Sequence, residues 1–174
     1  MSKHYIDNKK FLEALMDYQK AVRKAKRNKE EKPPIPNYIG ECFMKIAEHL
    51  SYKPNFMNYS FREEMVGDAV ENCLMYFENF DPNKTKNPFA YFTQIVFYAF
   101  LRRIAKESKN QYIKYKVLEN SVLFDNDLAY EEENGLKPFE IYANISEFTN
   151  NFEQKQKKKK KVVKKKGLEK FYNE

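Results

Sequence analysis

The chain is short of glycine and of long apolar segments. Its 174 residues include four glycines and no tryptophan. So few glycines argue against a turn-rich β fold, since tight turns rely on glycine, and against a glycine-rich phosphate-binding loop. No apolar run is long enough to span a membrane, and the N-terminus lacks the apolar core of a signal peptide. We therefore expect a cytoplasmic protein with no membrane partner.

Residues that bind metals or form disulfides are also scarce. His4 and His49 are the only histidines, so no His/Cys metal constellation exists. Cys42 and Cys73 each fall on an apolar helical stripe, which indicates buried free thiols in a cytoplasmic protein. The sequence predicts neither a metal site nor a cofactor.

The net charge of +7 is distributed unevenly. Residues 153–174 hold ten lysines and three acids, whereas residues 1–152 hold 22 basic and 22 acidic residues. Within the neutral part, residues 60–81 carry six acids against one arginine, and residues 82–118 carry eight basic residues against one acid. An acidic segment beside a basic one suggests two partners, the basic segment binding nucleic acid. The alternative is that the two segments only neutralise each other.

Apolar residues recur at helical spacing in four stretches. They cover residues 8–29, about 37–52, a third helix begun by a capping box of Ser60 and Glu63, and a fourth that starts at Asn87-Pro88 and continues toward Val117. The predicted fold is all-α, a compact bundle of about four helices in residues 1–117. An acidic linker with short helices would follow at 118–152, and a disordered Lys-rich tail at 153–174.

The fourth helix carries two different stripes. One suits a core and contains Phe89, Phe92, Ile95, Val96, Ala99 and Phe100. The other lies roughly opposite, has no obvious use in a core, and contains Tyr91, Gln94, Tyr98 and Arg102. Aromatic faces stack on bases, an amide can bind an adenine edge, and cations neutralise phosphates.

We therefore predict a nucleic-acid surface on and beyond this helix. Its candidate contacts are Tyr91, Gln94, Phe97, Tyr98, Arg102, Arg103, Lys106 and Lys109. Arg103 falls in the apolar sector, where a structural role at the helix end is an equal alternative.

The third helix has an acidic outer face. Its acids include Glu63, Glu64, Asp68, Glu71 and Glu78. Acids near a helix start suit the helix dipole, but the dipole does not account for a run along the whole helix. A metal-dependent nuclease using Glu63, Glu64 and Asp68 is an alternative, although no general base stands at motif spacing.

Residues 63–103 resemble the second conserved region of bacterial sigma factors. The pattern is an acidic helix, a Phe-Asp turn, a short basic loop and a Thr- and Tyr-bearing helix that ends in arginine. The matching positions, at fixed spacing, are Glu64, Asp68, Glu78, Phe80, Asp81, Tyr91, Thr93, Ala99 and Arg102. The short chain and its basic, apolar-ended tail are similar to the late-transcription sigma factors of T-even-type bacteriophages.

This resemblance implies a non-enzymatic transcription factor with several partners in the infected host. They are the bacterial RNA polymerase core, through the coiled coil of its β′ subunit, an A/T-rich late promoter, the phage DNA sliding clamp and a late-transcription co-activator. The residues it assigns to polymerase binding are Glu64, Asp68, Glu71, Glu78, Phe80 and Asp81. It assigns clamp binding to Leu168, Phe171 and Tyr172.

One departure from the family bears on mechanism. Many sigma factors carry two adjacent tryptophans where this chain has Gln94 and Ile95. Tyrosines on the same helix would then have to hold the opened strand. The alternative function is a free-standing helical regulator that binds nucleic acid without polymerase.

Overall fold

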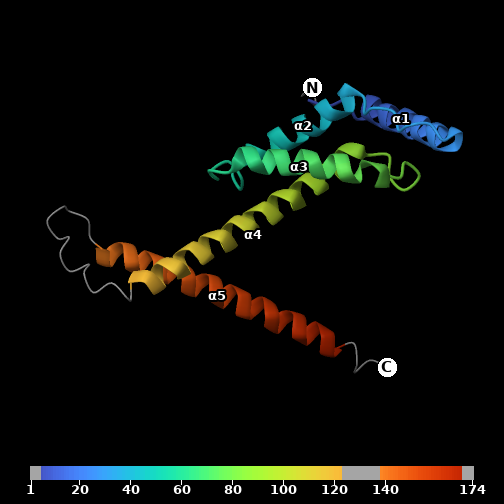
Figure 1. Ribbon diagram of the computed structural model, residues 1–174. Coiled ribbons are helices and arrows are strands. Elements are labelled where there is room, and N and C mark those ends of the chain that lie inside the picture. Colours follow the sequence, from blue (N-terminus) through green and yellow to red (C-terminus); the bar gives the residue numbers. More distant parts are fainter. Residues whose placement is uncertain (1–4, 123–137, 170–174) are drawn as a thin grey trace. The chain divides into compact units, whose positions relative to one another are not determined.

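A computed structural model describes residues 5–122 and 138–169 of the chain, with side chains for 5–121 and 143–158. The described residues form helices and no strand, so the all-α prediction is confirmed (Figure 1). The elements are α1 (Asn8–Asn28), α2 (Asn37–Ser51), α3 (Arg62–Tyr76), the 3₁₀ helix η1 (Phe77–Asn79), α4 (Pro88–Val122) and α5 (Pro138–Glu169). The chain divides into two compact units, Met1–Ala105 and Lys106–Glu174.

The first two helices begin and end where the sequence predicts. The Asp7 carboxylate accepts hydrogen bonds from the backbone N–H groups of Lys9 and Lys10, which caps α1. Lys29 ends α1 in the left-handed conformation at φ 60°. Residues 33–36 then keep the chain out of a helix until α2 begins, since three of the four are prolines.

The core of the first unit is built around phenylalanine rings. The Phe43 ring centroid lies 4.6 Å from that of Phe92 and 6.0 Å from that of Phe11. Helices α2 and α3 lie side by side over this core (Figure 1). Cys42 and Cys73 are free thiols buried in it, as predicted, and burial raises the pKa of Cys73 to about 12.

Helix α4 starts at the predicted residue, and its predicted core stripe faces the interior of the unit. The Asn87 side chain accepts a bond from the Ala90 N–H at 3.0 Å, and the side chain of Asn8 on α1 accepts one from the Phe89 N–H at 3.1 Å. These two bonds satisfy donors that the first helical turn leaves free. The stripe residues buried in the core are Phe92, Val96, Ala99 and Phe100, while Phe89 and Ile95 are half-buried.

The predicted capping box of α3 is wrong. Ser60 is exposed, Phe61 occupies the N-cap position, and no side chain caps the helix. The rings of Tyr59 and Phe61 pack with centroids 5.0 Å apart, and the Met65 N–H bonds the Phe61 carbonyl. Aromatic packing therefore sets the first turn of α3 one residue later than the serine.

The second unit joins the C-terminal part of α4 to α5. The rings of Tyr112 and Phe152 stack with centroids 4.6 Å apart, and those of Tyr115 and Phe148 meet edge to face at 5.2 Å. Glu119 accepts hydrogen bonds from Ser146 and Thr149, at 3.3 and 2.8 Å. Residues 106–122 are therefore packed by the chain that follows them.

This arrangement differs from the predicted domain limits. The division between units falls within α4, after Ala105, rather than at 117, because side chains beyond it pack on α5. The backbone of α5 continues to Glu169, so one helix spans the predicted boundary at 152 between the acidic linker and the Lys-rich tail. Residues 123–137 of the predicted linker lie outside the described residues.

Low pH is expected to destabilise the second unit. A hydrogen bond from Lys116, followed by bonds from Thr149 and Ser146, lowers the pKa of Glu119 below its ordinary value of 4.5. A carboxylate with a lowered pKa stabilises the fold above its unfolded pKa, and that stabilisation is lost as the pH falls through the folded pKa. Amide-exchange protection in residues 143–158 should thus decline below about pH 4.5. Glu119→Gln should flatten this decline, whereas an unchanged pH profile in the variant would contradict it.

Candidate nucleic-acid interface

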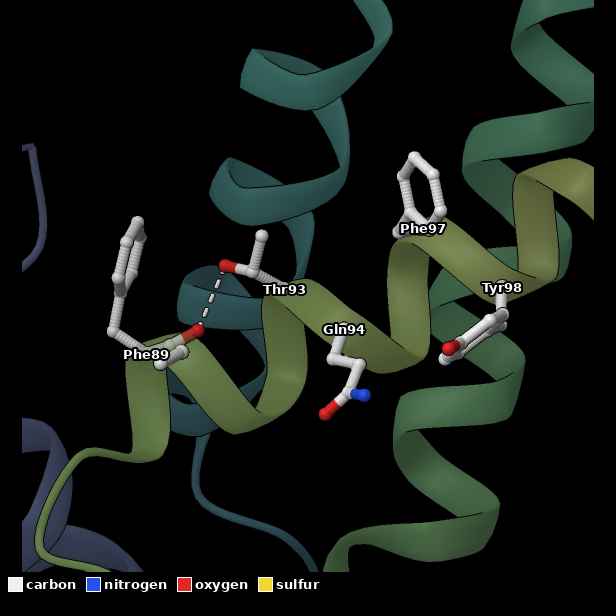
Figure 2. Close-up of a pocket in the computed structure, with 6 residues that line it drawn as sticks. Phe89, Thr93, Gln94, Phe97 and Tyr98 are labelled. Carbon is white, nitrogen blue, oxygen red and sulfur yellow. Dashed lines mark hydrogen bonds between the residues drawn. The ribbon is translucent and has the colours of Figure 1, made fainter.

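The outer side of α4 carries a shallow, open groove. Its volume is about 610 Å³, and the residues that line it are Phe89, Ala90, Thr93, Gln94, Phe97 and Tyr98. They form two neighbouring rows, each with four-residue spacing, because such residues lie one above the other on a helix. Figure 2 shows the rings of Phe89 and Phe97 on the same side of α4, with Thr93 between them. None of the lining residues is charged.

Contacts beneath the groove fix its shape. The Thr93 hydroxyl donates to the Phe89 carbonyl at 2.7 Å, so it is used within the helix (Figure 2). The ring of Phe56, which is only 4% exposed, supports Phe97 edge to face at 5.8 Å. Phe97 in turn meets Tyr98 at 5.8 Å.

The groove is suited to unstacked bases. The Tyr98 side chain is 50% exposed and that of Phe97 is 37% exposed, so both present ring surface to solvent. Gln94 is also exposed and supplies an amide beside the rings. Aromatic faces bind bases of any sequence, and an amide can bond the adenine edge. Three predicted contacts therefore share one surface.

Tyr91 does not belong to this surface. It is half-buried, and its ring lies 5.3 Å from Phe80 and 5.1 Å from Phe92. Burial, with a smaller effect of Cys73, raises the pKa of its hydroxyl. Helical spacing places Tyr91 on the outer stripe, but the chain after η1 folds back and brings Phe80 against it. Its ring therefore has a packing role, and its DNA contact stays a prediction.

The two predicted DNA-binding arginines lie in different surroundings. Arg103 Nη1 lies 3.1 Å from Asp68 Oδ2 on α3, and its side chain is only 17% exposed. Arg102 is exposed, and its Nη2 donates to Asn72 Oδ1 at 2.7 Å. Arg103 therefore ties α4 to α3, which agrees with the structural alternative for this residue, whereas Arg102 stays accessible. Among other predicted contacts, Lys106 and Lys109 are exposed and belong to the second unit.

Some of the predicted polymerase contacts are likewise exposed, and others are paired with basic residues of the same unit. Glu64 and Glu71 are exposed on α3, whereas Asp68 is engaged by Arg103. Glu78 is paired with Lys32 of the segment before α2. Part of the acidic face therefore neutralises basic residues of the same unit, while Glu64 and Glu71 remain on its surface.

The Phe-Asp turn has an internal role. Phe80, which the resemblance assigns to polymerase binding, is 2% exposed, because its ring packs on Tyr91 and Phe92. Asp81 is half-buried, and its carboxylate accepts the Asn83 N–H at 2.9 Å, which shapes the following turn.

Sequence reasoning missed an apolar patch near the end of α3. Leu74 is 38% exposed, and Met75 and Tyr76 are 59% and 44% exposed. Leu74 lies at the margin of the apolar stripe, where periodicity alone does not decide burial. Leu168 lies in the part of α5 whose side chains are not described, and Phe171 and Tyr172 lie outside the described residues.

No helix in residues 5–122 and 138–169 is long and apolar enough to cross a membrane. Within those ranges, no three His, Cys, Asp or Glu side chains gather closely enough to hold a metal ion, so Glu63, Glu64 and Asp68 form no such group. No protein-family model matches the chain, and no curated protein matches its sequence.

Proposed function

We propose that the chain is a sigma-type subunit that joins bacterial RNA polymerase core and directs it to an A/T-rich promoter. One observation carries the proposal. A single packed unit presents an uncharged aromatic and amide groove on α4 and, on α3, a surface with exposed Glu64 and Glu71. The first suits opened DNA, and the second suits a basic protein surface.

The groove would act on the strand that leaves the duplex. Bases flipped from the stack lose their neighbours, and ring faces compensate with about 1–3 kcal/mol per base. Tyr98 and Phe97 would supply these faces, and Gln94 would favour adenine. Arg102 would hold a phosphate, which adds affinity and makes it dependent on salt. This assignment needs no tryptophan pair.

The acidic surface would bind polymerase. Glu64 and Glu71 would complement basic residues of the β′ coiled coil, and the exposed Met75 and Tyr76 supply apolar area nearby in sequence. Charges at the rim of an interface mainly raise the association rate, whereas apolar residues at its centre carry more of the affinity.

Reversing the charge of the acidic surface tests the proposal. The double variant Glu64→Lys, Glu71→Lys should weaken binding to purified core by roughly tenfold or more, since like charges then face each other. The matched control is Glu13→Lys, Glu48→Lys, which changes two exposed acids on α1 and α2 by the same total charge. Pull-down titrations measure both. Equal losses in the two double variants, or no core binding by the native chain, would refute the assignment.

We further propose that residues 168–174 bind the phage sliding clamp and that a co-activator assists this binding. The support is the sequence alone, an apolar and aromatic segment after a lysine run. Deleting residues 168–174 should abolish stimulation by the clamp while leaving core binding unchanged. Transcription measured with and without clamp would show it, and loss of core binding on deletion would contradict this division.

A further inference from the structure

Helix α3 holds two consecutive arginines of α4 with two chemically different side chains. Asp68, a carboxylate, pairs with Arg103, whose side chain is 17% exposed. Asn72, a neutral amide, accepts the bond from exposed Arg102. Both α3 residues belong to one row with Glu64, at four-residue spacing, so the acidic row is interrupted at the position that contacts Arg102.

The Asn72 amide is itself held in one orientation. Its Nδ2 donates to the Asp68 carbonyl one turn earlier, at 2.5 Å, and its Oδ1 accepts from Arg102 Nη2 at 2.7 Å. Reversing the amide would place two donors against the guanidinium and two acceptors against each other, so this pair of bonds selects a single orientation. Half-burial of Asn72 adds to that constraint.

The two contacts have opposite electrostatic consequences. The Asp68 carboxylate cancels the charge of Arg103, which suits a side chain that is largely enclosed. The amide of Asn72 fixes one terminal nitrogen of Arg102 without cancelling its charge. A guanidinium has five N–H donors, so the exposed Arg102 retains donors and a full positive charge for a ligand.

We propose that Asn72 is a positioning residue that presents Arg102 to a backbone phosphate of single-stranded DNA. The choice of DNA as ligand rests on the proposed function. Phosphate fits the geometry because guanidinium groups bind its oxygens through paired N–H bonds. An aspartate at position 72 would still contact Arg102 but would cancel the charge that the phosphate needs.

The variant Asn72→Asp separates positioning from charge. It keeps the shape of the side chain and replaces the neutral contact by an ion pair with Arg102, which offsets part of the loss of the bond from Nδ2 to the Asp68 carbonyl, so the full chain should still unfold in one cooperative thermal transition. Binding of the full chain to fluorescent oligo(dT) should then release about one counterion fewer. The slope of log affinity against the logarithm of the salt concentration should therefore be smaller in magnitude by about 0.7.

Three comparisons make this result specific. Asn79→Asp on η1 adds the same charge at an exposed site and should leave the slope unchanged. In an Arg102→Gln background, Asn72→Asp should have no further effect on the slope. Asn72→Ala should keep the native slope, since Arg102 stays charged, but should weaken binding several-fold because the guanidinium is no longer positioned.

These outcomes also separate the inference from the proposed function. Core binding should be native in Asn72→Asp. Equal slopes for Asn72→Asp and Asn79→Asp, or native affinity in Asn72→Ala, would overturn the positioning role whatever the polymerase result. A native chain that fails to bind core while its Asn72 variants behave as expected would instead reject the sigma assignment and leave the positioning role in place.

Discussion

Phe92→Ala is expected to destabilise the first unit by about 3–5 kcal/mol. Phe92 is fully buried, and its ring contacts those of Phe11, Phe43 and Phe80 from three other segments. Removing it leaves a cavity where these segments meet, and small domains are stable by only about 5–15 kcal/mol in total. Urea unfolding followed by near-ultraviolet circular dichroism, which reports the packing of aromatic side chains, measures the loss.

Phe97→Ala is the matched control on the same helix. Phe97 is 37% exposed, and it meets Phe56 edge to face, so truncation should cost clearly less than it does at the fully buried Phe92. The two variants remove the same atoms from sites of different burial. If they destabilise the unit equally, the division of α4 into a core side and a surface side is incorrect.

Tyr98→Ala is expected to weaken promoter opening by roughly 5- to 150-fold, which corresponds to the loss of about 1–3 kcal/mol from one stacked base. Its ring is 50% exposed beside Gln94 in the groove, and its removal takes little from the core. Binding to polymerase core should stay native. Permanganate reactivity of unpaired thymines in the polymerase–promoter complex measures opening.

Two other tyrosines supply comparisons for this result. Tyr52 at the end of α2 is 63% exposed and lies outside the groove, so Tyr52→Ala should leave opening unchanged. Tyr91→Ala should lower the stability of the unit as well as opening, because its ring packs on Phe80. Native opening by Tyr98→Ala, or an equal defect in Tyr52→Ala, would argue against the groove as the strand-binding surface.

Much of the fold follows from periodicity and caps in the sequence. The starts of α1, α2 and α4 were predictable because Asp7, the prolines at 33–36 and Asn87 act locally. The buried side of α4 was predictable because its apolar residues follow the helical repeat. The groove residues Gln94 and Tyr98 were predictable because they lie opposite that side.

The rest depends on contacts between distant residues, which periodicity does not encode. Tyr91 lies on the predicted outer stripe but is half-buried, because the Phe80 ring packs against it. Asp68 and Arg103, 35 residues apart, are drawn into one ion pair, and Asn72 meets Arg102 across the same two helices. The start of α3 was misplaced because a serine with a glutamate three residues later satisfies the capping pattern, while ring packing decides the geometry.

The central claim is that this chain gives polymerase core its promoter specificity. The most direct test adds the purified full chain to bacterial core on a template with a short A/T-rich late promoter element and maps the transcript starts. We expect one specific start that requires both the chain and the core, and poor promoter binding by the chain alone. No specific start, together with tight binding of the duplex promoter by the chain alone, would contradict the claim and indicate a free-standing regulator.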